Sequence, residues 1–226
     1  LVKLTLVTGT IGIIFFCFFI NDKHKVKKKV SLKNAFTNIL SHSRLKTFLS
    51  IWFINSCANV LPMILFTFFI TYVLGGSDFD RQKVLFFYFL FAILGVPFWT
   101  KLSKKTNKTL AWSISLITSS VFFIFVVFLE PGDLFFFILI SCLTGFCLGA
   151  DLVLPPSIQA DITDMHRQKY DENISGILFS FITVITKLSF AVGSLFVFGI
   201  LGLFDFDANT PTSQQSKYFI IFSYSI

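Results

Sequence analysis

The sequence has few charged residues and few of the side chains that bind metals or act as nucleophiles. Asp, Glu, Lys and Arg make up 14% of its 226 residues, whereas a soluble domain carries about 25%. The three histidines, His24, His42 and His166, lie in polar segments, far along the chain from a second metal ligand or nucleophile. Cys142 and Cys147 lie inside an apolar run, and their spacing matches no metal motif. These shortages exclude an ordinary soluble domain, and neither an enzyme nor a metal site is predicted.

Apolar residues are abundant instead, at 54% of the chain, and they come in long blocks. Each block has about 17 to 30 residues, which is what a helix rising 1.5 Å per residue needs to cross a ~30 Å hydrocarbon layer. The sequence therefore predicts an all-α, polytopic membrane helix bundle with about six spans. The spans are residues 4–20, 49–74, 84–100, 109–129, 134–159 and 175–204.

The basic residues follow a pattern that fits this topology. Fourteen of the nineteen Lys and Arg lie in loops 21–46, 101–108 and 161–173, and three lie in loops 75–83, 130–133 and 205–217. The positive-inside rule places the basic loops in the cytoplasm. We expect the chain to lie in the plasma (inner) membrane. Because no aromatic or polar readout residues are interleaved with the lysine run 23–29, the net charge of +7 does not predict a nucleic-acid partner.

Both ends of the sequence suggest a piece of a longer protein. The chain begins without Met, and it ends nine residues into a new apolar run at 218–226. We expect residues 1–20 to be the end of a span and 21–48 to be a basic cytoplasmic central loop. Within that loop, the apolar spacing of 31–48 favours a short helix on the membrane surface. Residues 49–226 are expected to form a carboxy-terminal bundle that is cut in its last span.

Asp151 and Lys187 are the only charged residues well inside apolar runs. A charge at membrane depth is costly, so it is usually paired or functional. Counted along their helices from the expected cytoplasmic edge, Asp151 lies ~16 Å deep and Lys187 ~21 Å deep, so the two could meet. Two alternatives follow: an ion pair between them, or Lys187 as part of a solute-binding or gating site.

Other polar residues inside the spans also allow two interpretations. Asn55 and Asn59 are four apart and share a helix face, where they either join helices or line a cavity. A polar stripe in the sixth run must face protein or water rather than lipid. Its members are Gly176, Ser180, Thr183, Lys187 and Ser194.

The end of the fifth run carries two further features. Pro155 and Pro156 remove two backbone donors and should kink or break the helix, with or without a role in gating. Asp161 and Asp164 are expected on a cytoplasmic loop beside Arg167, either as a salt-bridge gate or as a solvated acidic segment.

Several of these residues carry a resemblance to a known family. The segment Gly-Ala-Asp-Leu-x-Leu-Pro-Pro-x-x-Gln-Ala-Asp-Ile-x-Asp at 149–164 is followed by Gly176, Phe179-Ser180-Phe181, Thr183 and Lys187-Leu188. Together with Asn55-Ser56-Cys57-Ala58-Asn59-Val60-Leu61-Pro62, these motifs resemble the glycoside–pentoside–hexuronide:cation symporters of the major facilitator superfamily.

The resemblance implies the carboxy-terminal half of a twelve-helix secondary active transporter. It implies symport of a sugar or glycoside with Na⁺ or H⁺ as coupling ion, without a bound cofactor, by a monomer surrounded by membrane lipid. Lys187 falls on a lysine of the eleventh span near the central cavity, and Thr183 falls on a polar cavity position. The alternatives are a carrier of a non-sugar or lipid-like solute, an integral-membrane enzyme or a structural subunit.

The residues expected to act fall into two groups. The first, for solute binding or gating, is Lys187, Thr183, Asp151, Asn55, Asn59 and Ser180. The second, for a cytoplasmic gate, is Asp161, Asp164 and Arg167.

Overall fold

The computed structural model describes residues 2–19, 43–170, 175–203, 221 and 224. Within these residues the chain is helical almost throughout and contains no strand, which confirms the all-α prediction. The α-helices are α1 (Val2–Phe19), α3 (Ser43–Phe68), α4 (Asp78–Lys105), α5 (Lys108–Ile124), α6 (Leu134–Tyr170) and α7 (Ser175–Leu203). A π-helical turn, Phe69–Val73, extends α3, and a 3₁₀ turn, Phe125–Phe128, extends α5.

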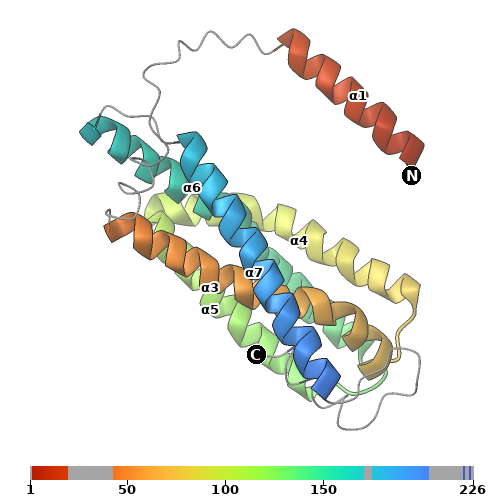
Figure 1. The fold of residues 1–226 in the computed structure, drawn as a ribbon. Helices are drawn as coiled ribbons and strands as arrows, with labels where there is room; N and C mark the ends of the chain where they lie inside the picture. The colour runs from red at the N-terminus through yellow and green to blue at the C-terminus, as the bar shows by residue number, and fades with distance from the viewer. Residues whose placement is uncertain (1, 20–42, 171–174, 204–220, 222–223, 225–226) are drawn as a thin grey trace.

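Five helices in the described part of the chain are long and apolar enough to cross a membrane. They are Leu45–Val73, Asp78–Lys105, Lys108–Phe128, Leu134–Gln168 and Ser175–Gly199. These match the second to sixth predicted spans. In the first, the apolar stretch found among the described residues is Leu6–Phe15, which is shorter than a span. Figure 1 shows α1 apart from the other helices.

Two predicted boundaries are wrong because helices continue beyond the apolar runs. α6 extends to Tyr170, so Asp161, Asp164 and Arg167 lie on a helix and not on a loop. No Gly or Pro interrupts 157–170, and Ile162, Thr163 and His166 are buried against the bundle. At the other boundary, α3 begins at Ser43, inside the segment expected to be the central loop. The rest of that loop, including residues 31–42 of the surface helix expected at 31–48, and the polar segment 205–217 lie outside the described residues.

The turns between helices have recognisable local causes. Ser77 caps α4 with a capping box: its hydroxyl accepts from the Asp80 backbone N–H, and the Asp80 carboxylate accepts from the Ser77 backbone. Gly75 precedes this cap with a φ of 70°, a left-handed conformation that favours glycine. At the start of α5, Asn107 Oδ1 accepts from the Leu110 N–H at 2.6 Å.

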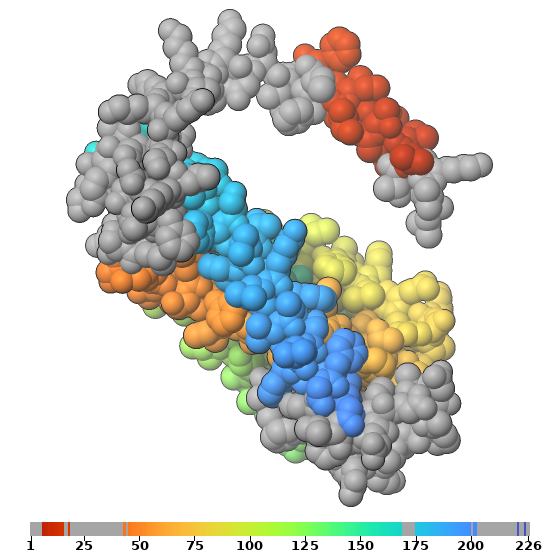
Figure 2. All heavy atoms as spheres, in the orientation of Figure 1, coloured from red at the N-terminus to blue at the C-terminus, as the bar shows by residue number. Residues whose placement is uncertain are grey.

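α6 lies at the centre of the bundle. In the most apolar segment of α6, 44% of the residues are buried, against 17–22% in the corresponding segments of the other four spans. It packs closely against α4 and α5, while α7 packs on α3. Figure 1 shows these five helices side by side, and Figure 2 shows α7 crossing in front of α3. α3 and α7 contact α6 near both of its ends, through Phe137 and Ile140 at one end and Ile162 at the other.

α4 and α6 touch backbone to backbone. A Cβ on Gly145 would lie 2.3 Å from the Tyr88 carbonyl oxygen, and a Cβ on Gly95 would lie 2.3 Å from that of Phe146. Small residues allow such close approach between membrane helices, where packing replaces the hydrophobic effect as the driving force. Trp99 Nε1 also donates to the Phe146 carbonyl at 2.8 Å. The glycine contacts and the Trp99 hydrogen bond together restrict the rotation of α6 against α4, and so the direction in which Asp151 points.

The bundle has two distinct ends. We call the basic end the one where α4 ends and α5 begins, because it carries Lys101, Lys104, Lys105 and Lys108. We call the opposite one the turn end, where Gly75 and Gly132 lie in tight turns. The Gly132 N–H donates to the Leu74 carbonyl at 3.1 Å and joins the two turns.

Candidate functional site

Asp151 forms the centre of a polar cluster between α3, α5 and α6. One carboxylate oxygen accepts a short hydrogen bond from Trp112 Nε1 of α5. The other lies 3.5 Å from Nδ2 of Asn55 and 3.5 Å from Nδ2 of Asn59, both on α3. Asp151 is half-buried, and Trp112 is 3% exposed. The carboxylate therefore links three helices through neutral donors only.

The cluster brings together three of the residues predicted from the sequence. Asn55 and Asn59 do share a helix face, and that face is turned toward α6. Their contacts with Asp151 lie at the outer limit of a hydrogen bond, whereas the Trp112 contact is short. The two amide contacts are thus the weaker hydrogen bonds of the cluster.

Two tryptophans of this region were not among the predicted site residues. The rings of Trp52 and Trp112 lie 6.4 Å apart between centroids and are tilted by 37°. Trp52 Nε1 donates to Thr186 Oγ1 of α7 at 2.9 Å. The sequence carried only a general signal, because an indole N–H inside an apolar span needs an acceptor, and nothing in the sequence identified Asp151 as that acceptor.

Of the two alternatives for Asp151 and Lys187, the ion pair is not found among the described residues. Lys187 is exposed on α7. The Trp112 indole and the two amides already satisfy the carboxylate. Ser180 and Thr183 are also exposed, and their hydroxyls donate back to the carbonyls of Gly176 and Phe179 at 2.9 Å each. The α7 stripe therefore lies outside the Asp151 cluster, and its role in solute binding stays a prediction.

Pro155 and Pro156 do not interrupt α6, which is helical from Leu134 to Tyr170. A break was one of the two predicted outcomes, and the structure excludes it. Leu154 and Pro155 are buried within the bundle, and that packing keeps the segment helical despite two missing backbone donors.

Asp161 has a partner that the sequence reading did not propose. Both of its carboxylate oxygens accept from Lys108 Nζ, at 2.7 and 2.5 Å, across the basic end from α6 to α5. Asp164 and Arg167 are exposed on α6 near the same end. The ion pair joins two helices of the same bundle, so a gating role for Asp161, Asp164 and Arg167 remains a prediction.

Removing the Lys108–Asp161 ion pair is expected to have a small effect. The side chains are 35% and 53% exposed, and exposed pairs contribute about 0.2–1 kcal/mol because water and salt screen them. Lys108→Met and Asp161→Asn should each lower the free energy of unfolding by less than about 1 kcal/mol, and the double variant by little more than either. Chemical unfolding of the complete protein in detergent, at low and high salt, measures this. A salt-resistant coupling of several kcal/mol would contradict it.

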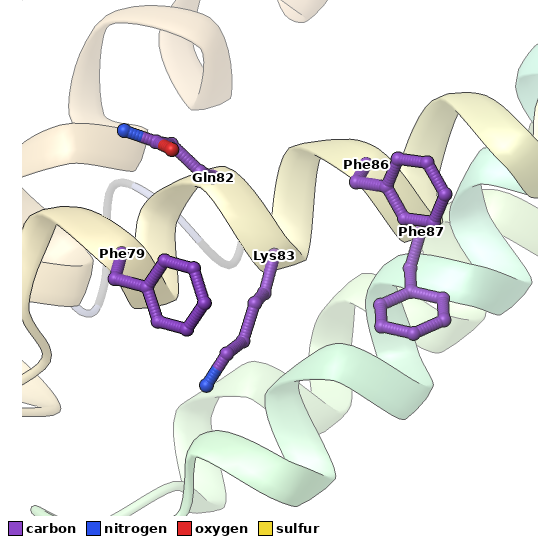
Figure 3. Close-up of a pocket in the computed structure, with 5 residues that line it drawn as sticks. All are labelled: Phe79, Gln82, Lys83, Phe86 and Phe87. Atoms are coloured by element: carbon purple, nitrogen blue, oxygen red, sulfur yellow. The ribbon is translucent and has the colours of Figure 1, made fainter.

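A shallow hollow on α4 near the turn end is a weaker candidate. Figure 3 shows Phe79, Lys83 and Phe87 pointing to one side of the helix and Gln82 pointing away. Lys83 Nζ lies 4.4 Å from the centroid of the Phe79 ring and 3.3 Å from Asp80 Oδ1. Because its one charged group is already paired, the hollow presents no convergent polar groups to a ligand. Among the described residues, no group of three or more His, Cys, Asp or Glu side chains could hold a metal ion.

Comparison with known proteins gives two matches. The family described as MFS/sugar transport protein matches residues 4–226. The sodium-dependent lysophosphatidylcholine symporter 1-A of Danio rerio is 25% identical over 170 residues, which cover 74% of this chain and 32% of that relative. The chain thus spans about a third of the relative that it matches.

Proposed function

Because the chain belongs to the MFS/sugar transport protein family, we propose that it is part of a carrier that moves a solute across a membrane by alternating access. A cation gradient drives this transport. The observation that carries the proposal is the Asp151 cluster: one carboxylate, two amides and two indoles, contributed by three of the five apolar helices, α3, α5 and α6. In such a bundle, polar groups that converge are expected to face a substrate path or another helix.

A sugar or glycoside suits the chemistry of this cluster. The amides of Asn55 and Asn59 offer both donors and acceptors for hydroxyl groups, and their loose contacts with Asp151 can be exchanged for contacts with a solute. The indole faces of Trp52 and Trp112 offer apolar surface for the C–H face of a sugar ring. Lys187, Thr183 and Ser180, which are exposed on α7, are proposed as further solute-binding or gating groups from the opposite side of the path.

A lipid-like solute is the second candidate, and the Danio rerio relative favours it. That protein is named a sodium-dependent lysophosphatidylcholine symporter, so carriers similar to this chain include one for an amphipathic solute. In this alternative, Trp52 and Trp112 contact acyl or headgroup carbons, and Asp151 and the amides bind the polar part. Na⁺ and H⁺ are both candidate coupling ions.

Gradient-driven uptake tests the function. The complete protein in proteoliposomes is offered labelled sugars, glycosides and a lysophospholipid, with an imposed Na⁺ or H⁺ gradient. Asn55→Ala/Asn59→Ala should weaken solute affinity about 30-fold, since two hydrogen bonds of about 1 kcal/mol each are lost. Thr67→Ala, an exposed position on the same helix, should leave uptake unchanged.

Each outcome of the uptake test has a separate meaning. Accumulation of a sugar that is weakened in the double variant supports the first candidate, and accumulation of the lysophospholipid alone supports the second. If the double variant accumulates the solute as well as the wild type does, the cluster is structural. If a well-inserted protein accumulates none of these compounds under either gradient, the proposal is wrong.

A further inference from the structure

Trp52 is the accessible member of a group of three aromatic side chains beside the Asp151 cluster. The rings of Phe48 and Trp52, both on α3, lie 6.4 Å apart between centroids with their planes at 25°, and Trp52 and Trp112 are the same distance apart. Phe48 is 6% exposed and Trp112 is 3% exposed, whereas Trp52 is only half-buried. The aromatic surface that a solute can reach in this group therefore belongs mainly to Trp52.

The two neighbouring indoles donate in different directions. Trp52 Nε1 donates to Thr186 Oγ1 of α7 at 2.9 Å, whereas Trp112 Nε1 donates to Asp151 of α6. An indole has one N–H donor and no acceptor, so each ring has a single polar anchor. The orientation of Trp52 is therefore tied to α7 and not to the carboxylate.

Thr186 is arranged to accept this hydrogen bond. Its hydroxyl donates to the Ile182 carbonyl, one turn earlier on α7, at 2.8 Å. A hydroxyl has one proton and two lone pairs, so the proton is used within α7 and a lone pair is left for Trp52. The χ2 angle of tryptophan is otherwise broadly distributed. Because Nε1 lies on the ring, away from Cβ, its bond to Thr186 fixes the rotation of the indole.

The position of Thr186 against α3 is itself fixed by close helix packing. Ser189, three residues later, is 0% exposed, and its Oγ lies 3.4 Å from an α3 backbone carbonyl. A Cβ on Gly193 would lie 2.7 Å from Val60 Cγ1 of α3. Small residues allow this close approach between membrane helices. The distance between Thr186 and Trp52 is therefore set by two packed helices.

A fixed indole plane favours one kind of solute. The C–H face of a pyranose ring is rigid and flat, so it gains full contact with an aromatic face only when the two are nearly parallel. Holding the indole in that orientation beforehand removes the cost of ordering it on binding. An acyl chain is flexible and adapts to an indole at any angle, so it gains little from a fixed plane.

The same face of α7 carries a polar group already proposed to bind the solute. Thr183 lies three residues before Thr186, so the two share a helix face. The Thr183 hydroxyl is exposed and donates to the Phe179 carbonyl, which leaves its lone pairs to accept from a sugar hydroxyl. The anchor of the Trp52 indole and a proposed hydrogen-bonding partner of the solute are therefore neighbours on α7.

We propose that Thr186 is a positioning residue, which holds the accessible indole face of Trp52 in the orientation that packs on the C–H face of a pyranose ring. Thr186 acts through Trp52 and needs no contact with the solute. Its effect is to favour sugars and glycosides over lipid-like solutes. This inference rests on the proposed function.

Ultraviolet resonance Raman spectroscopy of the complete protein in lipid tests the indole anchor without a solute. Thr186→Val removes the hydroxyl and keeps the shape of the side chain, so the indole N–H band should shift toward its position without a hydrogen bond. Thr186→Ser should retain the wild-type band. Thr47→Val, which removes an exposed hydroxyl bonded within α3, is the matched control and should also retain it. The shift should vanish when Thr186→Val is combined with Trp52→Phe. An unchanged band in Thr186→Val overturns the proposal.

Uptake by the same variants tests the specificity. The complete protein in proteoliposomes is offered labelled methyl glucoside, methyl galactoside and lysophosphatidylcholine. Thr186→Val should raise the KM for the accumulated methyl glycoside by about three- to ten-fold, because the aromatic contact is weakened, with little change in the maximal rate. Thr186→Ser and Thr47→Val should keep the wild-type KM. The KM for lysophosphatidylcholine, where it is accumulated, should be the same in all of them.

The outcomes separate this inference from the proposed function. An unchanged methyl glycoside KM in Thr186→Val overturns the inference and leaves the sugar carrier intact. Equal losses for the glycoside and for lysophosphatidylcholine also overturn it, because Thr186 then has a general structural role. If the wild type accumulates lysophosphatidylcholine and no methyl glycoside, the inference is wrong while the carrier function stands. If it accumulates no compound of either kind, both are wrong.

Discussion

Gly145→Ala is expected to destabilise the bundle severely, although alanine is ordinarily the better helix former. The added Cβ would lie 2.3 Å from the Tyr88 carbonyl oxygen and 3.0 Å from the Tyr88 carbonyl carbon. The obstacle is backbone, which cannot rotate away, so α4 and α6 must separate. Overpacking of this kind costs about 1–3 kcal/mol or more. The separation would also disturb the neighbouring contacts of Gly95 and Gly149.

Gly199→Ala is the matched control for this substitution. Gly199 lies in the helix interior of α7, and a Cβ there would meet nothing within 4 Å. The same chemical change should therefore stabilise the helix by about 0.5–1 kcal/mol. Thermal unfolding of the complete protein in detergent, with size-exclusion profiles, should move in opposite directions for the two variants. If Gly145→Ala is as stable as the wild type, α4 and α6 do not pack this closely.

Trp112→Phe is the second change with a large expected effect. It keeps an aromatic ring in a side chain that is 3% exposed and removes the N–H that donates to Asp151. Hydrogen bonds to charged groups contribute about 1.5–3 kcal/mol, and the remaining amide contacts at 3.5 Å are too long to replace this one. We expect a loss of about 2 kcal/mol in the free energy of unfolding and a loss of coupled transport.

Trp99 provides the comparison within the same core. It is also 3% exposed, but its Nε1 donates to a neutral carbonyl, that of Phe146. Trp99→Phe should therefore cost only about 1 kcal/mol for the lost bond. In a double-mutant cycle, the effects of Trp112→Phe and Asp151→Asn should be non-additive, whereas those of Trp99→Phe and Asp151→Asn should add. Equal costs for the two tryptophans would show that the charge on Asp151 contributes nothing to the Trp112 bond.

The candidate site was predicted in part because part of it is encoded locally. Asn55 and Asn59 share a face at any helix rotation, since four residues are about one turn. Asp151 was identified from its charge alone, because a carboxylate inside an apolar run needs a partner whatever the fold. Neither observation could identify that partner, and the sequence offered Lys187 as readily as the Trp112 that the structure places there.

The loop expected at 161–173 was predicted wrongly, because local composition does not determine where a helix ends. Its polar composition suggested the end of a span, yet α6 continues to Tyr170 because Ile162, Thr163 and His166 pack into the bundle. Apolar runs measure how much of a helix can lie in hydrocarbon, not where its hydrogen bonding stops. Helix ends outside the apolar region depend on what the helix contacts there.

The amino-acid sequence by itself determined the all-α class, the position of five spans and the residues whose charge or amide groups are unusual at that depth. These follow from the thickness of the hydrocarbon layer and from local composition, which need no knowledge of neighbouring helices. Only the tertiary structure decided that Asp151 contacts Trp112, that Asp161 pairs with Lys108, and that Lys187 is exposed and forms no ion pair with either carboxylate among the described residues. Each residue along a helix turns the side chain by about 100°, so such pairs depend on which helices are adjacent and how each is rotated. In this protein, glycines at the α4–α6 contact fix that rotation.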